Sequence, residues 1–143
     1  MRDYSRDLVA LRNQVGINQQ MAANLLKTPF RTYQRWEQEG SRMHTAFMEL
    51  LRFKCSAPKD VIATYLVEVN TEPTPAEIKS ARLKYGIEEP DLAGQVIYMK
   101  DKTWYRWESG KRKMKRAFLE LFYLKQRTPT PIYEQYAKKR EIA

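Results

Sequence analysis

The sequence has too few cysteine and histidine side chains for the commonest metal and catalytic sites. Among its 143 residues, Cys55 is the only cysteine and His44 is the only histidine. One thiol allows no internal disulfide and no thiol-metal cluster, and a histidine-based zinc site or catalytic triad lacks parts within one chain. We therefore expect no metal and no cofactor, and we expect Cys55 to be a small packing residue rather than a redox sensor.

Long apolar runs and glycine-rich loops are missing as well. No stretch approaches the roughly 18 apolar residues of a membrane helix, and the 5 glycines form no phosphate-cradling loop. The first residues, MRDYSRDLVAL, are acidic where a signal peptide would be basic and then apolar. Without a signal peptide or a membrane helix, we expect a cytoplasmic protein with no membrane partner. Paired acid/base groups are missing too, so we expect no catalytic residues and no small-molecule substrate.

Basic charge, by contrast, is plentiful. The chain carries 26 Lys and Arg against 17 Asp and Glu, a net charge of +9, and 43% of its residues are hydrophobic. The excess is +3 over residues 1–71 and +6 over residues 72–143. The length suits one domain or two small ones of roughly 70 residues. Such a basic, compact protein favours a polyanionic partner, most often a nucleic acid.

The segment from Lys100 to Met114 has a twin earlier in the chain. An offset of 71 positions places Trp107 on Trp36 and aligns RTYQRWEQEGSRMHTAFMEL with KTWYRWESGKRKMKRAFLEL. This many matches in one register indicate an internal duplication. The polar stretch NTEPTP separates the copies, so we predict one domain over 1–69, a linker over 70–75 and a second domain over 76–143.

Hydrophobic spacing predicts five short helices in each copy, and therefore an all-α fold. They span 3–15, 19–26, 29–37, 43–54 and 61–69 in the first copy, and 77–85, 90–97, 102–108, 111–124 and part of PIYEQYAKKR in the second. Asn18, Thr28 and Asp101 are the expected N-terminal caps. Residues 61–69 alternate as a strand would, but the repeat maps them onto PIYEQYAKKR, a clear helix after a proline, which favours helix in both copies.

Both copies carry the same ordered set of residues around their second and third helices. The set is Arg12, Gly16, Ala23, Thr32, Tyr33, Trp36, Glu37 and Gly40 in the first copy, and Arg82, Gly86, Leu92, Ala93, Thr103, Trp104, Trp107, Glu108 and Gly110 in the second. With a tight turn between those two helices, the pattern resembles the DNA-binding domain of the lambda repressor and Cro family of helix-turn-helix proteins. The run WYRWESG is also similar to small phage autorepressors encoded beside anti-CRISPR genes.

Two departures from the family pattern concern the turn. The second helix of the family ends in glycine, but Lys27 or Ile97 stands near that place. The helix-two alanine lies 14 positions before the glutamate in the first copy (Ala23) and 15 in the second (Ala93). We therefore expect an irregular turn in the second copy, and its base-reading register stays open by one residue.

The resemblance implies that the third helix of each copy enters the major groove of DNA, where each base pair presents its own donors and acceptors. Arg can bind guanine, Gln can bind adenine, and Phe can contact a thymine methyl group. The expected base-reading residues are Phe30, Arg31, Gln34, Arg35, Lys102, Thr103, Tyr105 and Arg106. The expected phosphate contacts, which make affinity fall with salt, are Gln19, Arg42, Lys111, Arg112, Lys113 and Lys115.

Other residues of the pattern are expected to be structural. In the family the glutamate after the third helix pairs with an arginine of the first, which implies ion pairs of Arg12 with Glu37 and of Arg82 with Glu108. These glutamates are then no catalytic pair. Four aromatic side chains of the third helices could stack on the bases of a single strand if they were exposed, but we expect them to be buried in the core. They are Tyr33, Trp36, Trp104 and Trp107.

A duplicated unit of this kind favours a transcriptional regulator that binds double-stranded DNA in a sequence-specific way. We expect a phage or mobile-element repressor that blocks a promoter by occupying it. One chain would act as a covalent pseudo-dimer on two unequal half-sites, in an imperfect inverted repeat or a direct repeat. Alternatively, one copy reads DNA and the other forms a homodimer or binds a protein. A protein-interaction module, such as an antirepressor or inhibitor, and an RNA-binding protein are the competing interpretations.

Overall fold

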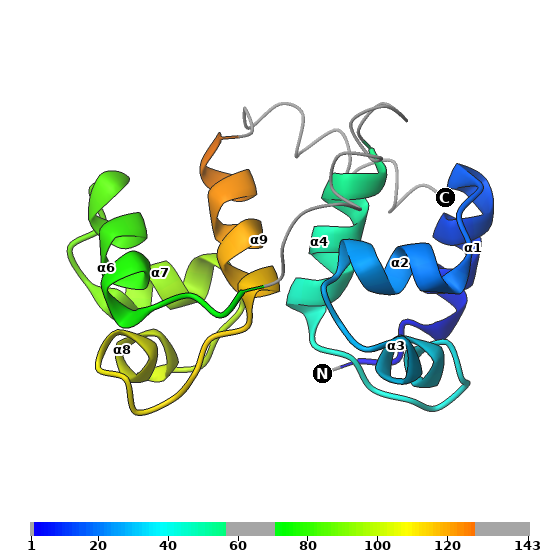
Figure 1. The fold of residues 1–143 in the computed structure, drawn as a ribbon, viewed down its shortest axis with the longest axis horizontal. Coiled ribbons are helices and arrows are strands. Elements are labelled where there is room, and N and C mark those ends of the chain that lie inside the picture. The colour runs from blue at the N-terminus through cyan, green and yellow to red at the C-terminus, as the bar shows by residue number, and fades with distance from the viewer. Residues whose placement is uncertain (1, 57–70, 128–143) are drawn as a thin grey trace.

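The computed structural model describes residues 2–56 and 71–127, and these residues form eight α-helices and no β-strand (Figure 1). The first half contains α1 (Ser5–Val15), α2 (Gln19–Leu25), α3 (Phe30–Trp36) and α4 (Thr45–Cys55). The second half contains α6 (Pro75–Lys84), α7 (Pro90–Val96), α8 (Thr103–Glu108) and α9 (Arg116–Arg127). The all-α prediction is confirmed for this part of the chain, whereas the predicted fifth helices lie outside it.

The turn between the second and third helices begins in the same way in both halves. The Thr28 amide donates to the Ala23 carbonyl (3.0 Å), and 71 positions later the Met99 amide donates to the Gly94 carbonyl (2.9 Å). The helices before the turn, α2 and α7, also begin and end 71 positions apart. Beyond this bond the turns differ, because α3 begins at Phe30 but α8 begins at Thr103, two positions later than the offset of 71 would place it, after Lys102 in the left-handed region at φ 66°. The turn of the second copy is therefore irregular, as expected, although the offset of 71 continues through it.

The extra residue of the second copy lies instead in the loop between α6 and α7. Gly16 precedes α2 by three positions, whereas Gly86 precedes α7 by four. The longer loop is held by Arg82, whose Nη1 donates to the carbonyls of Ile87 (2.9 Å) and Glu88 (2.6 Å). Since these bonds satisfy the added backbone, the insertion is absorbed before α7, which keeps the offset of 71 from α2.

Only one of the three predicted caps is correct. The Asn18 side chain accepts from the Met21 amide at the start of α2 (2.8 Å). Thr28 does not cap α3, which begins one residue later than expected, after Pro29. Asp101 does not cap α8 either, because the residue before that helix is Lys102, in the left-handed region at φ 66°. The N-cap positions are occupied by Pro29 and Lys102, and neither residue has a side-chain acceptor for the first amides of its helix.

Aromatic residues of the third helices fill the core of each half, as expected. Tyr33 and Trp104 are fully buried and Trp107 is 4% exposed. Trp36 is half-buried and packs against Phe47 of α4, with 4.8 Å between the ring centroids. These side chains attach α3 and α8 to the helices beneath them, which fixes the orientation of their outer faces.

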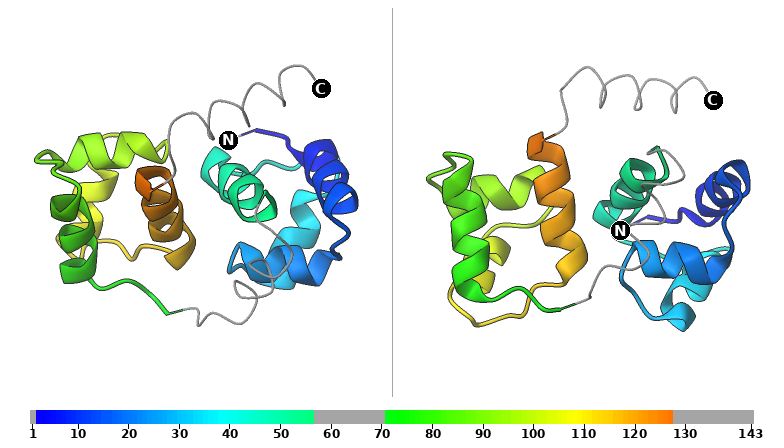
Figure 2. Two further views of the ribbon diagram at one scale, coloured as in Figure 1. Left: turned by 90° about the horizontal axis from the view of Figure 1, so that it is seen from above. Right: turned by 45° about the horizontal axis from the view of Figure 1, so that its top comes forward.

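Reciprocal contacts join the two halves along α4 and α9, which lie side by side in both figures (Figure 2). Lys54 of α4 is fully buried, and its Nζ donates to Glu120 of α9 (2.8 Å). Its counterpart 71 positions later, Lys125 of α9, pairs with Glu49 of α4 (2.8 Å). The same lysine position therefore pairs with the same glutamate position in both directions across the contact, as in an isologous interface. An approximate two-fold axis thus relates the halves.

His44 and Cys55, at the two ends of α4, both have structural roles. His44 caps α4 by accepting the Ala46 amide at Nδ1 (3.0 Å), and burial lowers the pKa of its imidazole below 6.5. Cys55 is buried, and burial raises the pKa of its thiol to about 12. A thiol that stays protonated at neutral pH supports the predicted packing role.

Replacing Glu120 with alanine tests the buried interface. The fully buried Lys54 ammonium would lose its counter-charge, so we expect the free energy of unfolding to fall by about 3 kcal/mol in urea denaturation at pH 7. The double variant Lys54→Met with Glu120→Leu removes the buried ammonium together with its counter-charge and should recover part of the loss, since Lys27 also loses its pair with Glu120. A loss below about 1 kcal/mol for Glu120→Ala, typical of an exposed pair, would contradict this description.

Candidate nucleic-acid interface

The helices predicted to read bases lie at one edge of the molecule. In Figure 1, α3 and α8 both lie at the lower edge, one in each half, while α4 and α9 stand between them. Each has a buried inner face, with Tyr33 on α3 and Trp104 on α8. The approximate two-fold relation therefore places two equivalent outer faces on the same side of the protein.

All four predicted base-reading residues of the first copy are exposed. They are Phe30, Arg31, Gln34 and Arg35, and Phe30 is 37% exposed despite its apolar ring. An aromatic ring left in water at the first position of α3, between cationic and amide groups, is compatible with contact to an apolar group such as a thymine methyl.

The second copy presents a chemically different set. By the offset of 71, Arg31, Gln34 and Arg35 correspond to Lys102, Tyr105 and Arg106. Lys102 and Tyr105 are exposed, whereas Thr103 and Arg106 are half-buried. Phe30 corresponds to Asp101, an exposed residue that sequence reasoning assigned to a cap rather than to this face. The two faces therefore share their positions and one arginine but not their donors and acceptors.

Two bidentate ion pairs hold these helices on the first helix of each half, as the resemblance implied. Arg12 donates to Glu37 through Nε (2.8 Å) and Nη2 (3.1 Å). Arg82 donates to Glu108 in the same way (2.7 and 2.9 Å). The hydrogen bond to its glutamate raises the pKa of each arginine. Because the forks are planar, they fix orientation as well as distance.

Gln19 is a second hydrogen-bond donor to Glu37 and so differs from its expected role. Gln19 Nε2 donates to Glu37 Oε1 (3.0 Å), so its amide supports the ion pair, while a phosphate contact was expected. Burial raises the pKa of Glu37, but the hydrogen bonds from Arg12 and Gln19 outweigh burial and keep that pKa below 4.5. The counterpart of Gln19 by the offset of 71 is Pro90, so this arrangement belongs to the first half alone.

The basic residues after α3 and α8 divide into two groups. The exposed side chains, in the loops that follow these helices, are Arg42, Lys111, Arg112 and Lys113. Lys115 is exposed as well, but it lies over the Phe47 ring of the other half (5.4 Å to its centroid). Arg116, next to it, is bound to Glu77 (2.7 Å). The first group keeps its expected place beside the reading helices, and Lys115 contributes to the contact between halves.

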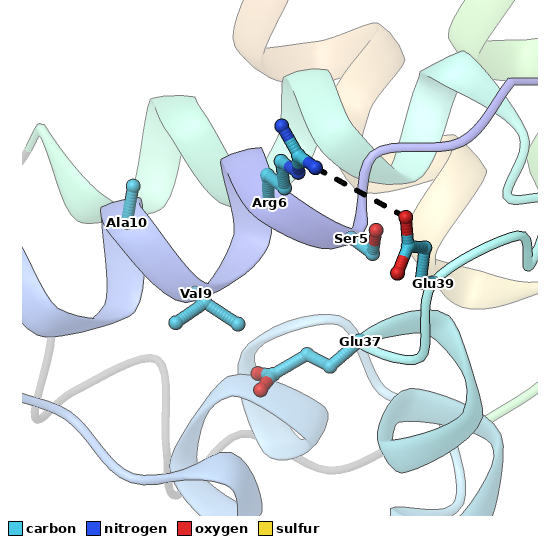
Figure 3. Close-up of a pocket in the computed structure, with 6 residues that line it drawn as sticks. All are labelled: Ser5, Arg6, Val9, Ala10, Glu37 and Glu39. Carbon is cyan, nitrogen blue, oxygen red and sulfur yellow. Dashed lines mark ion pairs between the residues drawn. The ribbon is translucent and has the colours of Figure 1, made fainter.

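A shallow hollow beside α1 is lined by two carboxylates. It measures about 380 Å³ and is lined by Ser5, Arg6, Val9, Ala10, Glu37 and Glu39. Glu37 extends from the end of α3 toward α1, whereas Glu39 turns toward Arg6 (Figure 3). Both are thus engaged by cations, Glu37 by Arg12 and Glu39 by Arg6.

Two other features are absent from residues 2–56 and 71–127. Within these ranges no three His, Cys, Asp or Glu side chains gather as a metal would require, and no helix has the length and hydropathy to cross a membrane. No protein-family model, curated protein or solved structure matches the chain.

The Arg12–Glu37 pair predicts a pH-dependent effect. The folded pKa of Glu37 lies below its unfolded value of 4.5, so the pair stabilises the protein above pH 4.5 and this stability is lost as the pH falls through the folded pKa. Arg12→Met should lower the free energy of unfolding by about 3 kcal/mol at pH 7. The difference from wild type should shrink at acidic pH, because both proteins then lack the pair.

Urea unfolding at neutral and acidic pH measures this difference. Arg31→Ala is the matched control, since it removes an exposed arginine from α3 and should change stability by less than about 0.5 kcal/mol. A loss for Arg12→Met that stays constant across the acid range would contradict the role of the Glu37 charge.

Proposed function

We propose that the chain is a sequence-specific regulator that binds double-stranded DNA through two tandem helix-turn-helix domains, and that it represses transcription by occupying a promoter. The observation that carries the proposal is the pair α3 and α8. These helices lie on one edge, expose equivalent positions and are fixed by equivalent Arg–Glu pairs. A rigid helix with an exposed polar face is what the major groove admits.

The surrounding charge supports a duplex as the ligand. Arg31 and Arg35 of α3 are exposed, and Arg42 and Lys111 to Lys113 follow the two reading helices in exposed loops. Cations beside a reading helix can contact the phosphates that flank the groove and set its register, while the helix itself reads bases. Attraction to phosphate also makes binding steeply dependent on salt.

The reciprocal interface favours an inverted repeat over a direct one. A two-fold relation turns the two reading helices into opposite directions along the duplex, as in a symmetric dimer. The half-sites differ because Gln34 faces one and Tyr105 the other. One chain then does the work of a dimer on a site that is not palindromic.

Single-stranded nucleic acid fits this arrangement less well. Stacking platforms need exposed aromatic rings, but Tyr33 and Trp104 are fully buried and Trp107 is 4% exposed. Exposed Phe30 and Tyr105 stand one in each half, at positions that do not correspond.

Selection of bound sequences from a random double-stranded pool at physiological salt tests the proposal. We expect a motif with two unequal halves in inverted orientation. Arg31→Ala should reduce base preference in the half-site read by α3, and Lys102→Ala should reduce it in the half-site read by α8. Each variant should weaken binding by about 1–3 kcal/mol. Lys79→Ala, which removes an exposed charge from α6, should leave both halves unchanged.

Other outcomes separate the alternatives. A palindromic motif that responds to only one of the two variants would mean that one half reads DNA and the chain forms a dimer. A pool with no enriched motif would overturn the proposal and point to a protein or RNA partner.

A further inference from the structure

The turn before each reading helix contains a side-chain-bearing residue in the left-handed region. Lys27 has φ 50° and Tyr98 has φ 64°, and the two are 71 positions apart. L-residues other than glycine rarely adopt this conformation, and they keep it only where the surroundings hold them in place. The resembling family has glycine near this point, so the two turns need an external restraint.

In both turns the other half supplies that restraint. Lys27 Nζ lies 3.4 Å from Oε1 of Glu120, on α9 of the second half, and the Lys27 side chain is 4% exposed. The Tyr98 hydroxyl donates to Oε2 of Glu49, on α4 of the first half. The same carboxylate position therefore reaches across the interface to the same turn position in each direction.

Each carboxylate also fixes the end of the helix before the turn. Lys54 Nζ, which pairs with Glu120, donates to the carbonyl of Leu25, the last residue of α2 (2.7 Å). In the second half, Lys125 Nζ pairs with Glu49 and donates to the Val96 carbonyl at the end of α7 (2.6 Å). Glu120 thus contacts the turn before α3 directly, and it contacts the end of α2 through Lys54. Glu49 has the same two roles at the turn before α8 and, through Lys125, at the end of α7.

We propose that Glu120 and Glu49 are positioning residues for DNA reading in the opposite half, Glu120 for α3 and Glu49 for α8. α3 begins three residues after Lys27, and α8 begins five residues after Tyr98. The direction of each reading helix is set by its turn, and the turn is set by the other half. This inference rests on the proposed function, in which α3 and α8 read bases.

If so, base preference in each half-site depends on a residue of the opposite half. A change on α9 alters the half-site read by α3, although α9 belongs to the half that contains α8. A carboxylate that only held the two halves together would affect both half-sites alike, so the crossed pattern distinguishes positioning from general support.

The test uses the full chain with Glu120→Gln and Glu49→Gln, which keep the side-chain shape and remove the charge. Hydrogen exchange without DNA follows the Thr28 and Met99 amides, which close the two turns. We expect Glu120→Gln to speed exchange at Thr28 by about tenfold and to leave Met99 within about twofold, and Glu49→Gln to do the reverse.

Binding to the selected duplex gives the second readout. Glu120→Gln should relax base preference in the α3 half-site only, and Glu49→Gln in the α8 half-site only. Tyr98→Phe is the sharpest variant, because it removes one hydroxyl and leaves the Lys125–Glu49 pair in place. It should reproduce the Glu49→Gln effect on Met99 exchange and on the α8 half-site.

Two results would overturn the inference. One is that either glutamine variant loosens both turns equally, which would mean general support. The other is that Tyr98→Phe leaves Met99 exchange unchanged. If the wild-type chain binds no duplex, the proposed function fails, but the exchange measurement still decides whether each half restrains the other's turn.

Discussion

The buried ammonium of Lys54 is the constraint on which the arrangement of this protein depends. A charge with no exposed surface must have partners, and the partners of Lys54 are the Leu25 carbonyl in its own half and Glu120 in the other. Folding of the first half and docking of the second are therefore not separate events. The halves can separate only if Lys54 and Glu120 are rehydrated, and the second half repeats the condition through Lys125 and Glu49. The interface thus couples two small domains, each near the lower limit of independent stability.

Much of the fold could be predicted because its signals are local. Hydrophobic spacing located the helices, the offset of 71 identified the duplication, and the family pattern implied the Arg12–Glu37 pair. The sequence was misleading at the turns and loops that join the helices. Thr28 has the chemistry of a cap, but its amide is used to close the turn. The extra residue of the second copy was placed in the turn because Ala93 was matched with Ala23, whereas the offset of 71 matches Ala23 with Gly94.

The contacts between the halves could not be derived from spacing, since Lys54 and Glu120 lie 66 positions apart. A clue was nevertheless present in the repeat. Glu49 and Lys54 recur as Glu120 and Lys125, whereas Gln34 recurs as Tyr105 and Phe30 as Asp101. An isologous contact uses each interface residue in both roles, so a change in one copy must suit the other. Residues that face solvent carry no such condition. Glu49 and Lys54 meet this condition, whereas Gln34 and Phe30, which are exposed on α3, differ from their counterparts.

The unequal outer faces of α3 and α8 give the bound protein a polarity. A dimer of identical chains sits on a palindrome in two indistinguishable ways, and neither of its sides is upstream. This chain, on the proposed function, fits its site in one way only. The α1 side of the first half then always points toward one flank and the α6 side of the second half toward the other (Figure 1). A neighbouring protein on the same DNA would meet a different surface according to the flank from which it approached, so the site itself would carry a direction.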